Sequence, residues 1–503
     1  MTVSLRSKAL VPTAGEPWPA RHVCLVLPVP VDKRTLASLP DGWRAAIMAT
    51  LKRRHLDLDA LGKEACSIHT ADGTLLSVTA LAPAASVFDQ GVTLRKALQP
   101  LLDEHPQDLA VALYGDEGLR ASAAERAVFS ACVNGTPLAL PKSGKPARAL
   151  KTLHLLGVPA GLDAALARTQ TLAEANTLAR QLTVTPPNAL TPALFRKRVA
   201  LLAKQSGWTC KVLDLPTLRR MKAGAFVAVA QGSEQADAAI VHLSWKPRGA
   251  RRRLALVGKG ICFDTGGHNL KTARGMYGMH EDMNGAAVAL ATLQALSSLR
   301  MPVEIHCFLA LAENHLSPRA YKQNDVITAL NGTTIEIVHT DAEGRMVLAD
   351  TLTLAAREKP DLILDYATLT GSMVTALGTR QCGVIASRLE LETLARGASV
   401  ATGERVVCFA AEADYDAELE SQVADVKQCL QEGEADHLLA ARFLSRFKGD
   451  ADWIHMDLSA YRHAGGLGAV ASAVNGFGVA WSCALVDAWL GEAAKPKDAR
   501  RSA

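Results

Sequence analysis

The chain has 503 residues, of which 49% are hydrophobic and 21% charged, with a formal net charge of +5 at neutral pH. A chain of this length is expected to form about two to three domains with room for a buried core. The net charge is small for the length, so composition gives no indication of a nucleic-acid or membrane-surface partner.

The sequence also lacks the features of an exported or membrane-spanning chain. It has no run of roughly 18 consecutive apolar residues, and its first residues lack the charged, apolar and small-residue order of a secretory signal. The ten cysteines are scattered without a CxxC pair, which is typical of small buried side chains in a reducing compartment. We therefore expect a cytoplasmic protein that does not contact a membrane.

Strand-like and helix-like segments alternate in the first part of the chain. Short apolar runs with β-branched residues predict strands at 22–29, 75–81, 108–114 and 150–158. Helices are predicted between them, at 41–55 and 121–132. No cluster of His, Cys or carboxylate residues follows these strands. Residues 1–165 are therefore expected to form a non-catalytic α/β domain with an oligomeric or regulatory role.

A long helix rich in Ala, Leu and Thr is predicted at 161–182, and it ends before the adjacent Pro186 and Pro187. Proline cannot continue a helix, and it pushes the preceding residue toward extended geometry. We therefore expect 166–190 to link the two domains, and 166–503 to form the C-terminal domain. Its last residues, 493–503, are expected to be a flexible tail.

The C-terminal domain contains four strand-like runs that each lead into a polar loop. They lie at 253–257, 303–311, 335–338 and 362–366. In open α/β sheets, binding sites form at the carboxyl ends of strands. The pattern predicts two α/β domains. The C-terminal one is expected to be a mixed, largely parallel sheet flanked by helices, with the active site at the strand C-terminal ends.

The loop after 335–338 places Asp341, Glu343 and Arg345 within five residues. Small residues between and after the acids let the backbone turn sharply, so both carboxylates can converge on one point. Converging carboxylates repel and their pKa values rise, unless a cation lies between them. Taken alone, the segment also fits an acidic turn that opens the apolar helix after it.

Further charged residues extend this group. Lys259 and Asp264 lie in the glycine-rich segment after 253–257, and Asp282 precedes a helix of small residues. Together with Asp341 and Glu343 they can hold two divalent ions, with bridging carboxylates. A lysine can coordinate only if a dication lowers the pKa of its ammonium group.

Two more cations, Lys271 and Arg345, lie beside the acidic residues in the sequence. A two-metal hydrolase needs one cation to stabilise the developing oxyanion and one to position the proton acceptor. Each residue has a simpler alternative role. Asp282 fits a helix N-cap, and a single lysine fits a solvated surface charge.

Six motifs occur in a fixed order along the C-terminal domain. They are 186–192, 259–267, Lys271 with 282–287, 312–314, 340–345 and 367–371. These motifs closely resemble those of the leucyl aminopeptidase family of dinuclear metallopeptidases, and the likeness extends over 172–490. Recurrence of six ordered motifs is far more specific than one short pattern.

The resemblance implies a metal-dependent aminopeptidase with two divalent ions per subunit, Mn²⁺ or Zn²⁺. One ion would be held by Lys259, Asp264, Asp282 and Glu343, and the other by Asp264, Asp341 and Glu343. Lys271 would stabilise the gem-diolate, and Arg345 would hold a bicarbonate ion that acts as general base.

The resemblance also implies how a peptide binds. Asp282 would receive the free α-amine, and the backbone of Leu369 and Gly371 would hold the peptide. Met279, Thr368 and Gly371 would shape the pocket for the first side chain, which we expect to be apolar and Leu-like. The family is typically hexameric, so a homohexamer is expected.

Three segments depart from the family pattern and leave the substrate preference open. His339 stands where Asn is usual, 429–437 replaces a glycine-rich loop, and 461–467 differs from better-known members. Two other functions remain open: a DNA-binding regulatory protein on the same scaffold, and a different metal-dependent acyl hydrolase. The first has little support, because no basic face interleaved with aromatic residues is present.

Overall fold

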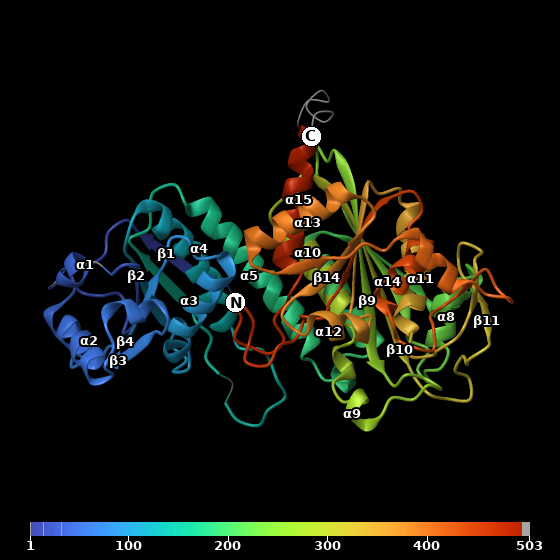
Figure 1. The fold of residues 1–503 in the computed structure, drawn as a ribbon, viewed down its shortest axis with the longest axis horizontal. Coiled ribbons are helices and arrows are strands. Elements are labelled where there is room, and N and C mark those ends of the chain that lie inside the picture. Colours follow the sequence, from blue (N-terminus) through green and yellow to red (C-terminus); the bar gives the residue numbers. More distant parts are fainter. Residues whose placement is uncertain (1, 14, 32, 146, 495–503) are drawn as a thin grey trace. The chain divides into compact units, whose positions relative to one another are not determined.

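The computed structural model describes residues 2–13, 15–31, 33–145 and 147–494, and they form two compact units (Figure 1). Unit 1 comprises the described residues up to Thr177, with Val400–Gly403 and His463–Asn475. Unit 2 comprises Leu178–Ser399, Glu404–Arg462 and the described residues from Gly476 onward. Of the expected tail, residues 495–503 lie outside the described residues.

Unit 1 is built on a six-stranded sheet with the order β1-β6-β5-β2-β4-β3. Its strands are β1 (Ser4–Lys8), β2 (His22–Pro28), β3 (Cys66–His69), β4 (Leu75–Leu81), β5 (Asp108–Leu113) and β6 (Thr152–Leu156). Its helices are α1 (Lys33–Ala37), α2 (Asp41–Arg53), α3 (Val87–Leu102), α4 (Glu117–Asn134) and the first part of α5 (Asp163–Thr183), with the 3-10 helix η1 (Leu58–Gly62). All neighbouring strands are parallel except β3 and β4.

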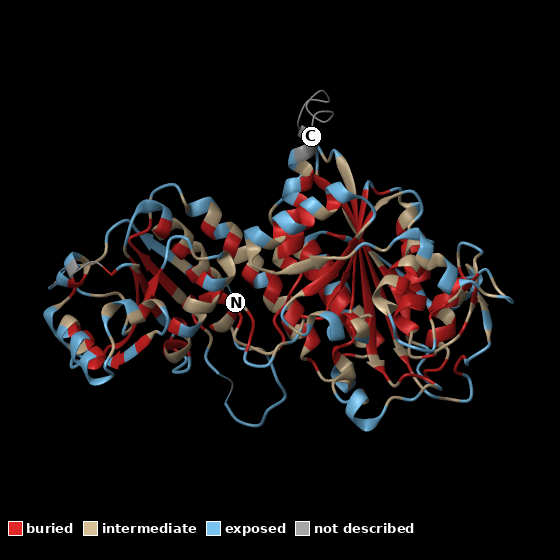
Figure 2. Cartoon of the chain, viewed as in Figure 1, coloured by how far each residue is buried: buried red, intermediate tan, exposed pale blue. Residues whose placement is uncertain are grey.

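The four strands expected in the first part of the chain all form, and so do the helices expected at 41–55, 121–132 and 161–182. Strands β2, β4 and β5 are buried along nearly their whole length, as the red strands of Figure 2 show. A strand that is buried on both faces reads as a continuous apolar run, so these strands are visible in the sequence. The short β1 and β3 and the helix α3 were not predicted. Strand β1 is largely exposed, and β3 alternates between buried and exposed residues.

Unit 2 is built on an eight-stranded mixed sheet with the order β15-β14-β17-β13-β9-β10-β8-β7. Its strands are β7 (Thr209–Asp214), β8 (Ala239–Trp245), β9 (Arg252–Asp264), β10 (Val303–Asn314), β13 (Leu362–Ala367), β14 (Cys382–Ala386), β15 (Val406–Cys408) and β17 (Asp452–Asp457). The central β17, β13, β9 and β10 run parallel, while β7, β8 and β14 pair antiparallel to neighbours. This is the mixed, largely parallel sheet expected from the sequence.

Helices cover both faces of this sheet. They are the second part of α5, α6 (Pro192–Ser206), α7 (Leu215–Arg220), α8 (Gly224–Ala230), α9 (Ala273–Met276), α10 (Asn284–Ser298), α11 (Glu343–Arg357), α12 (Gly371–Leu377), α13 (Leu389–Thr402), α14 (Asp436–Ser445) and α15 (Val479–Ala494), with 3-10 helices η2 (Pro187–Ala189), η3 (Met279–Glu281) and η4 (Ala413–Leu419). Gly258 of β9 lies against α10, whereas the next residue, Lys259, lies against α11. Successive side chains of a strand point to opposite faces, so α10 and α11 cover opposite faces of β9.

One expected strand forms only in part, and outside the main sheet. The run at 335–338 forms only β12 (Thr334–Glu336), which lies in a separate three-stranded sheet with β11 (Val326–Thr328) and β16 (Val426–Lys427). A tight turn at Gly332, whose φ is +94°, returns the chain antiparallel onto β11. This local hairpin pairing keeps β12 out of the main sheet. Among the described residues, no helix is both long and apolar enough to cross a bilayer.

Candidate metal and catalytic site

A cavity of about 470 Å³ opens at the carboxyl ends of β9 and β13, where the polar loops were expected to meet. Every residue that the sequence assigned to the site lines it: Lys259, Asp264, Lys271, Met279, Asp282, Asp341, Glu343, Arg345, Thr368, Leu369 and Gly371. Loops that are far apart in the sequence therefore come together in one site.

Strand β9 carries Lys259 and Asp264 into this cavity because glycines let a helix approach it closely. A Cβ atom on Gly258 would lie 2.5 Å from the Cα atom of Ala286 in α10, and one on Gly285 would lie 2.1 Å from the carbonyl oxygen of Tyr366. Real Cβ atoms do not approach so closely, so only glycine fits at both positions. The backbone of α10 therefore rests directly on β9 and β13.

Lys259 is buried and forms the centre of one half of the site. Its Nζ atom lies 2.9 Å from Asp282 Oδ1 and 2.8 Å from Glu343 Oε1. It also donates a hydrogen bond of 3.0 Å to the carbonyl oxygen of Thr368. Helix α11 comes this near because residue 344 is glycine, and a Cβ atom there would lie 2.8 Å from Lys259 Nζ.

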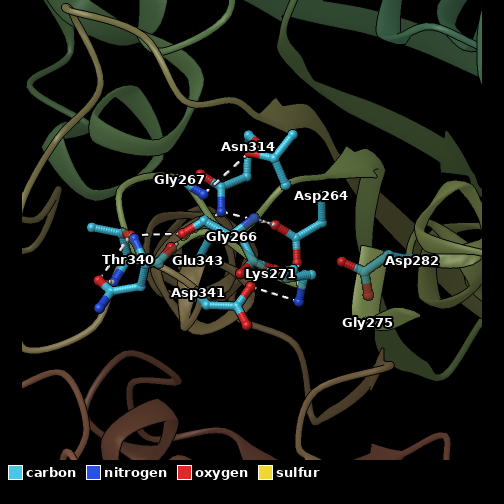
Figure 3. Close-up of polar contacts among 12 residues, drawn as sticks. Asp264, Gly266, Gly267, Lys271, Gly275, Asp282, Asn314, Thr340, Asp341 and Glu343 are labelled. Carbon is cyan, nitrogen blue, oxygen red and sulfur yellow. Dashed lines mark hydrogen bonds and ion pairs between the residues drawn. The ribbon is translucent and has the colours of Figure 1, made fainter. Parts of the chain in front are cut away.

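Lys271 forms the centre of the other half. Its Nζ atom lies 2.9 Å from Asp264 Oδ2 and 2.6 Å from Asp341 Oδ1. Figure 3 shows these side chains pointing toward one another beside Glu343. Two ammonium groups thus face four carboxylates, and negative charge remains in excess.

The role of Asp282 as a helix N-cap was not found. The N-cap of α10 is Met283, and no side chain caps that position. Asp282 Oδ1 instead accepts a hydrogen bond of 2.6 Å from the hydroxyl of Thr368 and faces Lys259. The carboxylate is therefore turned into the cavity and not onto the helix end.

Asn314, at the end of β10, holds two site loops together. Its Nδ2 atom donates to Asp264 Oδ1 at 2.9 Å and to the carbonyl oxygen of Thr340 at 3.1 Å. The backbone N–H of Gly266 also donates to Asp264 Oδ1, at 2.8 Å. Thr340 Oγ1 in turn donates to the carbonyl oxygen of Gly266 at 2.6 Å (Figure 3). These bonds position the Asp264 and Asp341 carboxylates, whereas the sequence analysis named Asn314 only as part of the motif 312–314.

Three carboxylates of the site, Asp282, Asp341 and Glu343, have raised pKa values. Burial raises the pKa of Asp282 to about 8, against the opposing effect of Lys259, and Glu343 and Asp264 raise it further. Burial and the charges of Glu343 and Asp264 raise the pKa of Asp341 to about 7. Burial also raises the pKa of Glu343, followed by the effect of Asp264. Each of these groups would be stabilised by added positive charge.

The donor set fits a divalent cation. Asp264, Asp341 and Glu343 each offer an oxygen atom within 4.8 Å of the others. Asp282 Oδ2 and Glu343 Oε2 are buried and accept no hydrogen bond from the described residues. Buried acceptors without partners are costly, and oxygen-rich sites of this kind suit Mn²⁺ and Mg²⁺ as well as Zn²⁺.

Arg345 pairs with Asp436 and not with a carboxylate of the cluster. It is buried, and its Nη2 atom donates to both Asp436 Oδ1 and Oδ2 at 2.8 Å. Its Nη1 atom donates to the carbonyl oxygen of Gln428 at 3.0 Å. Sequence reasoning missed Asp436, because it lies in the segment 429–437 that departs from the family pattern.

The residues expected to bind substrate line the cavity. Met279 begins η3, and Gly371 begins α12, which Thr370 caps through its hydroxyl. The backbone N–H of Leu369 donates to Asp457 Oδ1 at 3.1 Å. Because this N–H is already bonded, only the carbonyl oxygen of Leu369 is left for a bound peptide.

Comparison with known proteins finds the same family throughout. Residues 177–482 match the model of the cytosol aminopeptidase family, catalytic domain. A probable cytosol aminopeptidase of Parasynechococcus marenigrum is 39% identical over 63% of this chain and 66% of its own length. One of Rhodopseudomonas palustris is 40% identical over 56% of each chain. The aligned part therefore spans about half to two thirds of these curated relatives.

A solved structure resembles nearly the whole chain. The bottromycin maturation enzyme BotP, in complex with Mn, superposes with a TM-score of 0.81 and 29% sequence identity. The match covers 93% of this chain and 99% of that one. The likeness thus extends beyond the catalytic domain.

Proposed function

Because the chain belongs to the cytosol aminopeptidase family, we propose that it is a metal-dependent aminopeptidase that releases N-terminal residues, preferably apolar and Leu-like, from peptides. The observation that carries this proposal is the convergence of four carboxylates and two lysines on one cavity. The geometry provides excess negative charge, which a metal-dependent hydrolase needs to hold its ions.

We assign the ligands of two divalent ions as the resemblance implies. Lys259, Asp264, Asp282 and Glu343 would hold one, and Asp264, Asp341 and Glu343 the other. When bound, such ions lower the pKa of a coordinated water and polarise the scissile carbonyl. In the structure, Asp282 and Glu343 raise the pKa of Lys259, although burial acts in the opposite direction. Lys259 therefore has to lose its proton before it can act as a ligand.

The chain's own groups would orient the peptide. The Asp282 carboxylate, held by the Thr368 hydroxyl, accepts a hydrogen bond from the free α-amine. Lys271 then donates to the oxygen that becomes negatively charged at the reacting carbonyl, as an oxyanion donor does. Met279 and Gly371 line the cavity beside this position and accommodate the first side chain.

A peptide panel tests this function. Leu-amide and short peptides with free N-termini should be hydrolysed in the presence of Mn²⁺ or Zn²⁺, and their N-acetylated forms should not. The rate should rise toward alkaline pH, because the α-amino group, with a reference pKa of about 8, must lose its proton to bind. Equal rates on acetylated and free substrates would instead support a different metal-dependent acyl hydrolase.

The same preparation tests the remaining assignments. We propose a cytoplasmic homohexamer, and light scattering of the purified protein measures its mass directly. Salt-dependent retention on DNA without peptide hydrolysis would favour a DNA-binding regulatory protein. A preference for acidic N-terminal residues would keep the reaction and contradict the assignment of Met279 and Thr368 to an apolar pocket.

A further inference from the structure

The guanidinium group of Arg345 is paired with a carboxylate of the chain itself, that of Asp436. Asp436 receives two hydrogen bonds of 2.8 Å from Nη2, and Nη1 is bonded to the carbonyl oxygen of Gln428. The Nε atom of Arg345 is shielded from solvent. A buried guanidinium needs an anionic partner, and in this chain Asp436 supplies it.

Asp436 is held in this place by its neighbours on both sides. Ala435 has a φ of +50°, in the left-handed region, and Asp436 is the first residue of α14. The backbone N–H of His437 donates to Ser372 Oγ at 2.9 Å. At the other end of the segment, Gln428 Nε2 donates to the carbonyl oxygen of Ala342 at 3.0 Å. The segment is therefore tied to the acidic turn and to α12.

The Asp436 carboxylate belongs to the same cavity as the carboxylate cluster. Asp436, Arg345, Lys271 and Asp341 all line it, and about a fifth of the Asp436 side chain is exposed. A carboxylate paired with a guanidinium is an anion of the same charge and hydrogen-bonding geometry as a bicarbonate ion on that guanidinium. The two would compete for the same donors.

We propose that Asp436 replaces bicarbonate as the anion that Arg345 holds, and that its carboxylate accepts the proton of the attacking water. This inference rests on the proposed aminopeptidase function. As the water oxygen bonds to the peptide carbonyl carbon, an O–H bond breaks and the proton passes to Asp436. When the C–N bond breaks, Asp436 returns that proton to the leaving amine. The net reaction consumes one water and needs no dissolved anion.

Binding of bicarbonate tests the first half of the proposal without any catalysis. Isothermal titration of the metal-loaded protein with sodium bicarbonate should give no heat of binding for the wild type. It should give saturable binding for Asp436→Gly, in which the guanidinium is free. Binding by the wild type, or no binding by both proteins, would overturn the proposal. This readout remains valid even if no peptide is hydrolysed, so it separates this inference from the proposed function.

Chemical rescue tests the second half. In carbonate-free buffer the wild type should hydrolyse Leu-amide at its full rate, and Asp436→Gly should lose about a hundredfold or more in kcat, the scale of general-base catalysis. Added bicarbonate or formate should restore much of the Asp436→Gly rate. A structural defect would not be rescued. A wild type that needs bicarbonate, or an Asp436→Gly protein with full activity in its absence, would contradict the proposal.

Two further variants control for folding. Asp436→Asn keeps the size of the side chain and the start of α14, so it should be inactive and should not be rescued, because the amide blocks the guanidinium. Asp416 forms a comparable pair with Arg442, through bonds of 2.9 and 2.5 Å, outside the cavity. Asp416→Ala should show neither the kinetic loss nor bicarbonate binding. A rescue of Asp436→Asn equal to that of Asp436→Gly would overturn the assignment.

Discussion

Lys259 and Lys271 carry the same charge and lie 12 residues apart in the sequence, but each meets a different pair of carboxylates. Lys259 is enclosed by Asp282 and Glu343, whereas Lys271 faces Asp264 and Asp341 and is more exposed. A more exposed ammonium group can reach a bound peptide. The geometry therefore agrees with separate roles for the two lysines, one toward the metal and one toward the substrate.

Lys271→Ala should lower kcat by roughly 10²–10³, the scale of losing one oxyanion donor, and leave the metal content nearly unchanged. Metal analysis by mass spectrometry and Leu-amide kinetics measure both effects. Lys322→Ala, which removes an exposed lysine paired with Asp325, is the matched control. Loss of metal together with kcat in Lys271→Ala would exchange its role with that of Lys259.

The residues that could be predicted from the sequence are those whose side chains indicate a chemical role, such as carboxylates and lysines. Acidic and basic side chains in ordered motifs, together with the family resemblance that these motifs carry, identified the residues that line the cavity. Asp436 could not be predicted, since its partner Arg345 lies far away in the sequence and no local pattern connects them. Asp282 lines the cavity, as its assignment to the site predicted, and its contact with Lys259 excludes the N-cap role that was the simpler alternative.

At the scale of helices and strands, α11 can approach β9 closely because residue 344 is glycine and has no Cβ atom. A Cβ atom on residue 344 would lie 2.8 Å from Cδ, Cε and Nζ of Lys259. A flexible lysine can move away, so the fold should survive, but the ammonium group should be displaced from Glu343 and Asp282. The position of the start of α11 thus determines where the Lys259 ammonium group lies.

Gly344→Ala should therefore weaken Mn²⁺ binding by at least about tenfold, about 1.4 kcal/mol, with little change in thermal stability. Gly397→Ala in α13, where an added methyl group meets nothing within 4 Å, is the control and should bind Mn²⁺ normally. Titration calorimetry measures the affinity, and thermal denaturation measures the stability. Unchanged affinity in Gly344→Ala would show that Lys259 is not a ligand.

A second element contact predicts a dependence of stability on pH. Asp350 of α11 accepts hydrogen bonds from the backbone N–H groups of Phe226 (2.8 Å) and Leu330 (2.7 Å). Burial raises the pKa of Asp350 to about 6, whereas its ordinary value is 3.8. The folded state therefore holds this proton more tightly than the unfolded state. The resulting stabilisation is present below the ordinary value and is lost as the pH rises through about 6.

Between about pH 5 and pH 7.5 the wild type should lose about 1 kcal/mol of unfolding free energy relative to Asp350→Asn, which has no such titration. Urea denaturation of both proteins at the two pH values gives this difference directly. Other titrating groups cancel in the comparison. A difference of the opposite sign would mean that the Asp350 carboxylate is stabilised, and not penalised, by its surroundings.

Strands and helices were predictable to the extent that they are buried and uninterrupted. The run at 335–338 was correctly recognised as extended, but its sheet was not, because a β-branched run does not specify its pairing partner. The turn at Gly332 specifies it, and that turn lies before the run. Short and exposed strands such as β1 also carry too little apolar pattern to stand out from loops.

For the whole molecule, the excess negative charge of the cavity predicts stabilisation by metal. An ion that binds only the folded state adds about 2.7 kcal/mol at 100 times its dissociation constant. Mn²⁺ should therefore raise the melting temperature of chelator-treated protein and restore hydrolysis that chelation abolishes. Glu343→Ala, which removes one of the two carboxylates proposed to be shared by both ions, should show neither effect. Full activity in exhaustively stripped protein would contradict metal dependence.

The set of chain segments that make up unit 1 could not be predicted from the sequence. His463–Asn475 belongs to it although this segment follows most of unit 2 in the sequence. Arg95 of α3 donates to the carbonyl oxygens of Gly465 and Val470, at 2.9 and 3.0 Å, and Val470 is buried in the core of the unit. Such long-range packing leaves no local periodicity, so a sequence reading assigns the segment to its neighbours in the chain.

The dimensions of the cavity at the ends of β9 and β13 restrict what can reach the carboxylates. A space of about 470 Å³ lies within the range of sites that enclose a small molecule or cofactor. A loose chain end can enter such a space, whereas a terminus packed into a folded domain cannot. The cavity thus acts as a size filter. Under the proposed aminopeptidase function, it should accept short peptides with a free end and exclude chain ends that are packed into a folded domain.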